Sequence, residues 1–587
     1  MGKYYLDSLF NPASIAVIGA SNRPNSVGMK VFDNLLKEKF AGKLYPINLK
    51  HKKIQGHRAF ASIREISEPI DLVIIMTPAE TVPAAISECG EKGVKAAIII
   101  SAGFSEGGDK GRELEQAFLK LAHQYGMRVI GPNCLGMMRP HLKLNATFNN
   151  NFAIPGNIAL VSQSGAIVAA ILDWALDKQI GFSTMVSLGN AADLDFGEIL
   201  DFLALDSETK SILLYIEGIH HVRRFMSGLR AAARMKPVIV IKGGKHAQGS
   251  RAAYSHTGAL VGNDDAFDAA LRRAGAVRVM TIEQLFSAAE LLSSHYRTKG
   301  NRLVIITNGG GAGVMAADQA SEVNIDLAKL SENTISELNH VLPNAWSHQN
   351  PVDIIGDATP ERYHAALELC AKDEAIDGLL TILTPVAMSN PFKVAEQFIL
   401  DAKESKKPML ACWMGEKSVK SSRKLFAKHN IPYFNTPEEA VEAFSYLADY
   451  QRNQQLLLQV PEPLLLHPKP DIKGACLIIE SVLAEQRKLL TTTESKSILN
   501  AFGIATSQAI NASTANEALI AAESLRFPIV MKINSPDITH KQDVGGVRLN
   551  IENAESVRTA FNQIIDNVKK LKPEAKILGE GASSLNN

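Results

Sequence analysis

Residues 14–21 of the chain read SIAVIGAS, residues 157–166 read NIALVSQSGA and residues 301–313 read NRLVIITNGGGAG. Each stretch is a short apolar run, rich in β-branched residues, that passes directly into a turn of small residues ahead of a helix-forming segment. Further apolar runs alternate with helical segments after each of them. This alternation is typical of parallel sheets with crossover helices, so the sequence predicts an α/β fold built from three strand-turn-helix cycles.

The remainder of the chain has a different pattern. The prolines Pro461, Pro463, Pro468 and Pro470 indicate a linker over residues 459–480. After it we expect a helix near 494–502, the strands FPIVMKI and VRLNI, and a long helix near 553–570. A strand then starts at KILGEG shortly before the final residue, so we expect this last domain, 481–587, to be incomplete.

Composition excludes several classes of protein. The 587 residues include 62 lysines and arginines against 61 acids, and this net charge of +1 lacks the basic excess of a general nucleic-acid binder. Five cysteines without a CxxC pair indicate a reducing cytoplasm. No signal peptide is recognisable, and no apolar run reaches the roughly 18 residues that span a bilayer, so we expect a cytoplasmic protein without membrane contact.

The first glycine-rich turn predicts a phosphate site. Gly19, Ala20 and Ser21 end the first strand, where backbone N–H groups and a helix N-terminus can approach a phosphate. A dinucleotide-binding domain carries an acid at the end of its second strand, whereas this chain carries Lys50 and further cations there. That charge favours the 3′-phospho-ADP of coenzyme A over NAD, and leaves NADP open.

Similar turns open the next two domains. They contain Ser162, Ser164 and Gly165 in one case, and Asn308, Gly309, Gly310 and Gly311 in the other. Neither has the lysine of a Walker A loop, and we expect the two helix N-termini to converge on one phosphate. The alternative is that the serines simply cap a helix.

Two histidines lie in distinctive segments, His256 in SHTGAL and His540 in SPDITHK. An imidazole can accept a phosphoryl group when N–H groups hold the phosphate and a carboxylate orients the ring. Glu217, at the end of SILLYIEG, is a candidate for that carboxylate. The alternative for His256 is an ordinary loop histidine.

Taken together, the motifs SIAVIGAS, GPNCLG, SQSGA, YIEG, SHTGAL, TNGGGAG and MKINSPDITHK resemble the NDP-forming acyl-CoA synthetase family across essentially the whole chain. This family contains ADP-forming acetate–CoA ligases and relatives of succinyl-CoA synthetase. The resemblance looks closest to the synthetase-like module of long bacterial protein-lysine acetyltransferases, whose acetyltransferase domain is absent from this sequence.

The resemblance implies a Rossmann-type CoA-binding domain over 1–145, flavodoxin-like doubly wound domains over 146–298 and 299–458, and the first lobe of an ATP-grasp domain over 481–587. It assigns coenzyme A to Gly19, Ala20, Ser21, Lys50, Ser101, Gly103, Asn133 and Cys134. It assigns phosphate to Ser162, Ser164, Gly165 and the Asn308–Gly311 turn. His256 becomes the phosphorylated residue with Glu217 as its partner, His540 a relay histidine, and Lys532 a nucleotide contact.

The implied reaction converts acetyl-CoA, phosphate and ADP into acetate, CoA and ATP, reversibly and through a phosphohistidine. The nucleotide requires Mg²⁺, whereas His256 requires no metal. We expect an oligomer, with a second subunit as one source of the remaining ATP-grasp residues. Two alternatives stay open: a module that binds acyl-CoA without turnover, as part of an acetyltransferase, and an NADP oxidoreductase.

Overall fold

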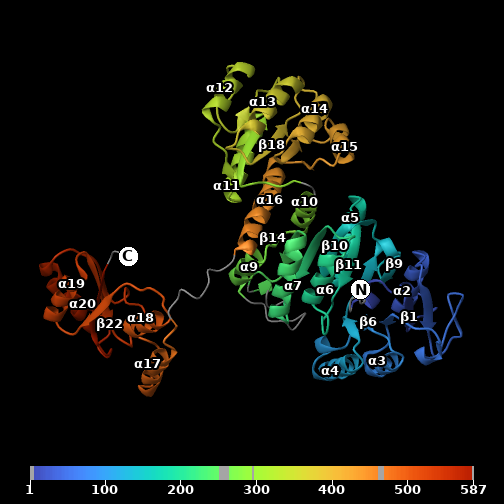
Figure 1. The fold of residues 1–587 in the computed structure, drawn as a ribbon, viewed down its shortest axis with the longest axis horizontal. Helices are drawn as coiled ribbons and strands as arrows, with labels where there is room; N and C mark the ends of the chain where they lie inside the picture. Colours follow the sequence, from blue (N-terminus) through green and yellow to red (C-terminus); the bar gives the residue numbers. More distant parts are fainter. Residues whose placement is uncertain (1–5, 247, 250–262, 294–295, 460–468, 585–587) are drawn as a thin grey trace. The chain divides into compact units, whose positions relative to one another are not determined.

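The computed structural model describes residues 6–246, 248–249, 263–293, 296–459 and 469–584. The chain forms two compact units, Met1–Gln459 and Val460–Asn587. Figure 1 shows that both combine helices with sheets, as the alternating sequence pattern predicts.

The first sheet of unit 1 contains five parallel strands in the order β2-β1-β5-β6-β7. Ile15, Val17 and Ile74 are fully buried, as expected for a parallel sheet with helices on both faces. The strands are β1 (Ser14–Ile18), β2 (Lys43–Ile47), β5 (Leu72–Ile75), β6 (Ala96–Ile99) and β7 (Arg128–Ile130). The helices are α1 (Asp7–Phe10), α2 (Val27–Lys37), α3 (Val82–Glu91) and α4 (Asp109–Gln124), and β3 (Lys53–Ile54) pairs with β4 (His57–Arg58).

The second sheet has the order β14-β13-β12-β10-β11-β8-β9. Its five parallel strands are β10 (Pro155–Ser162), β11 (Phe182–Ser187), β12 (Ser211–Ile216), β13 (Val238–Lys242) and β14 (Val277–Val279). Counted along the chain they lie in the order 2-1-3-4-5, the flavodoxin-like arrangement. The helices are α5 (Gly165–Asp177), α6 (Phe196–Leu205), α7 (Val222–Met235), α9 (Asp264–Arg273) and α10 (Ile282–Ser293).

A hairpin within the expected first domain, residues 1–145, and its flanking residues belong to the second sheet. The hairpin of β8 (Gly136–Arg139) and β9 (Leu144–Thr147) belongs to the second sheet, because Met137 and Met138 pair antiparallel with Val186 and Met185 of β11. The hairpin covers the free edge of β11 with buried side chains. The structure thus places the change of sheet between residues 130 and 136.

The third sheet repeats the order 2-1-3-4-5 as β16-β15-β18-β19-β20, with β17 also pairing with β15. Its strands are β15 (Arg302–Thr307), β16 (Asp326–Leu327), β17 (Val352–Asp353), β18 (Gly378–Leu383), β19 (Met409–Trp413) and β20 (Tyr433–Phe434). The helices are α11 (Gly310–Glu322), α12 (Glu332–Val341), α13 (Pro360–Lys372), α14 (Pro391–Glu404), α15 (Lys420–Lys428) and α16 (Pro437–Leu458).

Helix α16 joins the third sheet to the second. Its Phe444 packs in the same core as Leu285 of α10. At its C-terminal end the Asn453 side chain donates to the carbonyl oxygen of Ala276 at 2.7 Å. One apolar core therefore extends through both domains, and Figure 1 shows α16 running from one to the other.

Unit 2 contains an antiparallel sheet in the order β21-β24-β22-β23. Helices α19 and α20 pack on each other and on its strands. The strands are β21 (Ala509–Ala512), β22 (Ile529–Asn534), β23 (Val547–Ile551) and β24 (Gly579–Ser584); the helices are α17 (Ile472–Ala484), α18 (Thr492–Ala501), α19 (Ala515–Leu525) and α20 (Ala554–Leu571). The expected helix near 494–502, both expected strands and the long helix are confirmed. The segment expected as a linker contains most of α17 instead.

Candidate functional site

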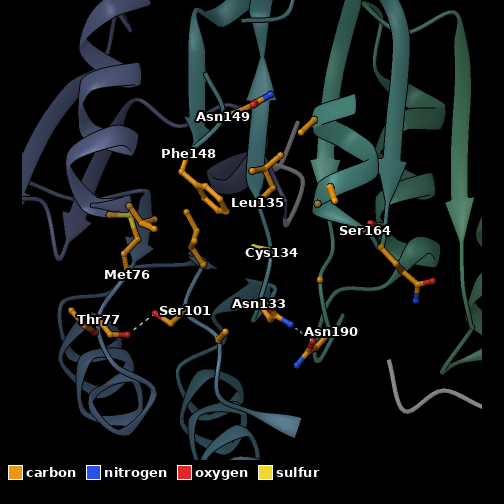
Figure 2. Close-up of a pocket in the computed structure, with 18 of the residues that line it drawn as sticks. Met76, Thr77, Ser101, Asn133, Cys134, Leu135, Phe148, Asn149, Ser164 and Asn190 are labelled. Atoms are coloured by element: carbon orange, nitrogen blue, oxygen red, sulfur yellow. Dashed lines mark hydrogen bonds between the residues drawn. The ribbon is translucent and has the colours of Figure 1, made fainter. Parts of the chain in front are cut away.

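A cleft of about 920 Å³ lies between the first and second sheets of unit 1 (Figure 2). It opens where the carboxyl ends of parallel strands from both sheets converge, which is where ligands bind in open α/β folds. Its lining consists of Arg23, Val27, Met76, Thr77, Pro78, Ile100, Ser101, Ala102, Asn133, Cys134, Leu135, Phe148, Asn149, Asn150, Gln163, Ser164, Gly165, Ala166, Ala169, Gly189 and Asn190.

The turn after β7 crosses the middle of the cleft. Asn133 has a left-handed backbone (φ 55°), and its side chain donates to Asn190 Oδ1 at 3.4 Å. Figure 2 shows these two side chains pointing toward one another. The turn lies so close to the loop after β11 that a Cβ atom on Gly189 would be only 2.3 Å from the Pro132 carbonyl oxygen.

Cys134 is buried, and its thiol donates to the carbonyl oxygen of Ile99 at 3.3 Å. Burial raises the pKa of this thiol to about 12. A thiol with such a pKa supplies almost no thiolate near neutral pH. Cys134 thus shapes the cleft and is not equipped to act as a nucleophile.

The N-terminus of α5 forms the opposite wall. The Ser164 hydroxyl caps the helix by accepting the Ile167 N–H at 3.3 Å, so the expected capping role is present. Ser162 is fully buried and bonds within the turn, accepting the Ser164 N–H at 3.0 Å. Gly165 allows the close approach of Leu135, since a Cβ atom on it would lie 3.1 Å from the Leu135 Cβ. The wall presents Ser164, Gly165 and the start of a 13-residue helix.

The glycine turn after β1 lies next to the cleft. Gly19 has φ +92°, and α2 starts so close to it that a Cβ atom on Gly28 would lie 1.9 Å from the Gly19 carbonyl oxygen. Ala20 is fully buried, and Ser21 accepts the Arg23 N–H at 3.0 Å. The three predicted residues themselves do not line the cleft, but Arg23 in the same turn does.

Asn48 ties the cationic segment to this turn. Its side-chain amide donates to the Ala20 carbonyl oxygen at 2.8 Å, and its Oδ1 accepts the N–H groups of Lys50 at 2.8 Å and His51 at 3.0 Å. Lys50 is exposed. The Asn48 side chain therefore connects the backbone of the Lys50 segment with the glycine turn.

Ser101 and Gly103 follow β6. Ser101 lines the cleft and donates to the Thr77 carbonyl oxygen at 2.6 Å (Figure 2). Gly103 lies outside the lining, and its N–H is bonded to Glu106 Oε1 at 2.6 Å.

Glu217 follows β12 and is 9% exposed. Its backbone N–H donates to Gln163 Oε1 at 2.6 Å, so it lies directly behind a residue of the cleft lining. His256, its expected partner, lies outside the described residues. The proximity of the two residues is therefore still a prediction.

The third-domain turn has the local structure expected from its glycines. Asn308 joins it to the loop after β18, donating to the Thr384 carbonyl oxygen at 2.9 Å and accepting the Thr384 N–H at 2.8 Å. Gly309 precedes α11, and Gly310 and Gly311 begin it. None of the four residues lines the cleft, so their convergence with α5 on one phosphate stays a prediction.

In unit 2, Lys532 lies on β22 and is exposed, and His540 is exposed in the loop before β23. Lys496 of α18 lies near Lys532: burial, and then the charge of Lys532, lower the pKa of Lys496. Lys496 is also held by Ser507, whose backbone and hydroxyl oxygens both accept from it at 3.0 Å. The two ammonium groups therefore lie close enough to interact electrostatically.

Two kinds of feature are not found in the described part of the chain. The residues there contain no group of three or more His, Cys, Asp or Glu side chains arranged to hold a metal ion. No described helix combines the length and apolar character needed to cross a membrane.

Sequence reasoning missed several residues of the site. Gln163, Asn190 and Phe148 line the cleft, and Lys496 accompanies Lys532. Gln163 adjoins the recognised serine turn, so its position was a usable signal. Asn190 and Phe148 reach the cleft only through pairing of distant segments, which the local sequence does not reveal.

Four domain-family models match the chain in succession: a CoA binding domain over residues 13–140, a succinyl-CoA ligase like flavodoxin domain over 155–292, a Ligase-CoA domain over 303–457 and an ATP-grasp domain over 481–580. This series, with a cleft between its first two members, defines the class of NDP-forming acyl-CoA synthetases. The predicted fold class is confirmed.

Acetate–CoA ligase [ADP-forming] I of Archaeoglobus fulgidus is 41% identical over 574 residues, which cover 98% of this chain and 82% of that protein. The chain belongs to the family of ADP-forming acetate–CoA ligases. Subunit alpha of the type II enzyme of Pyrococcus furiosus is 43% identical over 452 residues, 76% of this chain and 98% of that subunit. Its subunit beta is 39% identical over 109 residues, 18% of this chain and 46% of that subunit.

A solved structure of the dinucleotide forming acetyl-coenzyme A synthetase 1 of Ca. Korarchaeum cryptofilum, in complex with phosphate and ADP, is 36% identical and has a TM-score of 0.72. The similarity covers 78% of this chain and 99% of that chain.

Proposed function

We propose that this protein is an NDP-forming acyl-CoA synthetase that interconverts acetyl-CoA, phosphate and ADP with acetate, CoA and ATP. The observation that carries the proposal is the cleft, in which the turn of Asn133 and Cys134 faces the capped N-terminus of α5. A helix N-terminus binds a phosphate dianion through its N–H groups and its dipole. The domain matched as CoA-binding supplies the facing wall.

The reaction has three reversible steps. A phosphate oxygen attacks the thioester carbonyl carbon, the C–S bond breaks, and the CoA thiolate leaves and takes up a proton. A ring nitrogen of His256 then attacks the phosphorus of acetyl phosphate, and the P–O bond to acetate breaks. Finally the phosphoryl group passes to ADP by way of His540.

We assign the phosphates of CoA to Gly19, Ala20, Ser21 and Lys50. The bonds of Asn48 support this assignment, because they hold the Lys50 segment over the glycine turn. The thiol end of CoA extends toward Asn133 and Cys134 with Ser101 along its path, and Ser164 and Gly165 receive the inorganic phosphate. We place Gly103 and the Asn308–Gly311 turn at the edges of this site.

We assign the nucleotide to unit 2, with Lys532 and its neighbour Lys496 as phosphate contacts. Phosphoryl transfer of this kind uses Mg²⁺, and the described residues contain no group of three or more His, Cys, Asp or Glu side chains arranged to hold it. We propose that further ATP-grasp residues, on this chain or on a second subunit, complete the nucleotide site.

A binding experiment tests the CoA site. CoA and dephospho-CoA, which lacks the 3′-phosphate, are titrated against the wild-type protein, Lys50→Ala and the exposed control Lys110→Ala. We expect Lys50→Ala to weaken CoA about tenfold, the loss of about 1.4 kcal/mol typical of one charged contact, and to leave dephospho-CoA unchanged. Equal binding of NADP and CoA would favour the oxidoreductase and contradict the proposal.

A labelling experiment tests the chemistry. Incubation with acetyl-CoA and radiolabelled phosphate is expected to give an acid-labile, base-stable phosphoprotein, with the label lost in His256→Ala. CoA binding without any label would favour a non-catalytic acyl-CoA-binding module, such as part of an acetyltransferase. The near full-length similarity to ligases does not favour that alternative.

A further inference from the structure

We propose that Gln163 and Tyr215 are positioning residues that together hold the carboxylate of Glu217 in place. The inference rests on the proposed function, in which Glu217 orients the phosphorylated histidine. It concerns two side chains to which neither the sequence motifs nor the reaction scheme gives a role.

The side-chain amide of Gln163 bonds to backbone groups just beyond the point where two paired strands end. Strands β10 and β12 pair in parallel up to Ser162 and Tyr215, and Gln163 is the next residue. Its Oε1 accepts the backbone N–H groups of Glu217 at 2.6 Å and Gly218 at 3.0 Å. Its Nε2 donates to the Gly218 carbonyl oxygen at 2.8 Å. One side chain therefore makes three bonds to the backbone that carries the carboxylate.

Burial protects the three hydrogen bonds of Gln163 from competition with water. Gln163 is 5% exposed and Glu217 is 9% exposed, so water cannot readily replace the three bonds. The backbone on the other side is held as well, since the Gly243 N–H donates to the Ile216 carbonyl oxygen at 2.8 Å. The turn after β12 is thus attached to the ends of both neighbouring strands.

Tyr215 acts on the carboxylate itself. It lies on β12 two residues before Glu217, which directly follows the strand. Its hydroxyl lies next to the Glu217 side chain, because a Cβ atom on Gly243 would be 3.1 Å from the Tyr215 hydroxyl oxygen and 3.6 Å from Glu217 Cγ. Burial, followed by the charge and hydrogen bond of Glu217, raises the pKa of Tyr215 to about 12, so the phenol stays protonated and remains a donor.

Gln163 also lines the cleft beside Ser164. A displacement of Gln163 would consequently move the phosphate-binding turn and Glu217 together. Gln163 connects the place where we put the phosphate with the carboxylate that orients its acceptor.

Amide hydrogen exchange tests the geometry without requiring activity. Gln163→Met keeps the length of the side chain and removes all three bonds, whereas Gln163→Glu keeps the acceptor for the two N–H groups. We expect the amides of Glu217 and Gly218 to exchange at least tenfold faster in Gln163→Met and to stay protected in Gln163→Glu. Unchanged protection in Gln163→Met would overturn the role of Gln163.

A double-mutant cycle tests the mechanism. The rate of His256 labelling is measured for Gln163→Met and Tyr215→Phe, each with Glu217 intact and with Glu217→Gln. We expect slowing of about tenfold or more for Gln163→Met and about fivefold for Tyr215→Phe, CoA affinity within about threefold of wild type, and no further slowing once Glu217 is replaced. Equal slowing in both backgrounds would show that the two residues act independently of Glu217.

Gln454→Met is the matched control, because it removes comparable bonds to the carbonyl oxygens of Ala233 and Gly275 far from the cleft. It is expected to leave labelling unchanged. Absence of labelling in the wild type would refute the proposed function alone, and the exchange experiment would still decide whether Gln163 holds the Glu217 turn.

Discussion

At the scale of single residues, burial separates reactive side chains from structural ones. Four of the five cysteines, Cys89, Cys134, Cys370 and Cys412, are buried, whereas Cys476 is exposed on α17. Burial raises the pKa of the Cys134 thiol to about 12. Its place in the centre of the cleft therefore does not make it chemically active.

We predict that an alkylating reagent near neutral pH modifies Cys476 rapidly and leaves Cys134 unmodified, because only an accessible thiolate reacts. Peptide mass spectrometry after brief labelling measures the outcome, with Cys476→Ser as the control that removes the fast site. In the Cys134→Ser variant, His256 should take up the phosphate label at a rate within about threefold of wild type, since serine keeps a small polar side chain at this position. Rapid labelling of Cys134, or loss of function in Cys134→Ser, would contradict this assignment.

At the scale of elements, one buried amide joins α2 to the strand that enters the cleft. Asn34 is fully buried. Its side chain donates to the carbonyl oxygens of Thr147 at 2.7 Å and Asn149 at 2.8 Å, on either side of Phe148 in the cleft lining (Figure 2). Asn34 of the first domain thereby holds residues 147–149, at the end of β9 in the second sheet.

We predict that Asn34→Ala lowers the free energy of unfolding by about 2 kcal/mol, because it leaves the buried carbonyl oxygen of Thr147 and the partly buried one of Asn149 without their donor. Urea denaturation measures this change. Lys37→Ala on the same helix is the control, since its ion pair with Asp33 is exposed and surface pairs contribute about 0–1 kcal/mol. Equal effects of the two substitutions would contradict the structural role of Asn34.

At the same scale, the N-terminus of α18 is held by a capping box and by an arginine. Thr491 and Glu494 form a capping box at its N-terminus, and Arg487 bonds to the Glu494 carboxylate at 2.6 Å. The hydrogen bond from Arg487 is the main cause that lowers the pKa of Glu494 to about 2, from 4.5 for an unperturbed group. A carboxyl group with a depressed pKa stabilises the fold above its unfolded pKa and loses this effect as pH falls through its folded pKa.

We therefore predict that Glu494→Ala weakens the protection of α18 amides at neutral pH by about 1 kcal/mol, the usual contribution of a cap. The difference from wild type should shrink as pH falls from 4.5 toward 2. Hydrogen exchange at matched pH measures it, and Glu494→Gln separates the hydrogen bond from the charge. A difference that does not vary with pH would contradict the role of the ionised carboxylate.

At the scale of the whole molecule, every residue that lines the cleft lies in unit 1. The core that joins the second and third sheets through α16 lies there too. The alpha subunit of the Pyrococcus furiosus enzyme, which is similar over 76% of this chain, is a separate polypeptide. Unit 1 thus contains the complete lining of the cleft together with its own apolar cores.

We predict that residues 1–459, expressed alone, bind CoA within about threefold of the affinity of the full chain and label His256 from acetyl-CoA and phosphate. Calorimetry and the labelling assay measure the two properties, and circular dichroism confirms folding. A folded fragment that does not bind CoA would show that unit 2 contributes to the CoA site.

The amino-acid sequence alone predicted the three strand-turn-helix cycles and the glycine-rich turns. It could do so because these features depend on local patterns: β-branched runs such as Ile15–Ile18 favour buried strands, and a turn with a left-handed backbone, such as φ +92° at Gly19, favours glycine. The motif order also indicated the family, since motifs such as GPNCLG and SQSGA are themselves short and local.

Only the tertiary structure decided which segments meet. The hairpin at 136–147 joins the second sheet, Gln163 binds the backbone 54 residues away at Glu217, and Asn34 reaches Thr147 over 113 residues. Such contacts depend on sheet order and register, which no local pattern encodes, because any free strand edge or buried amide can accept several partners. The partner is selected when the whole core packs and leaves one arrangement in which these buried polar groups are bonded.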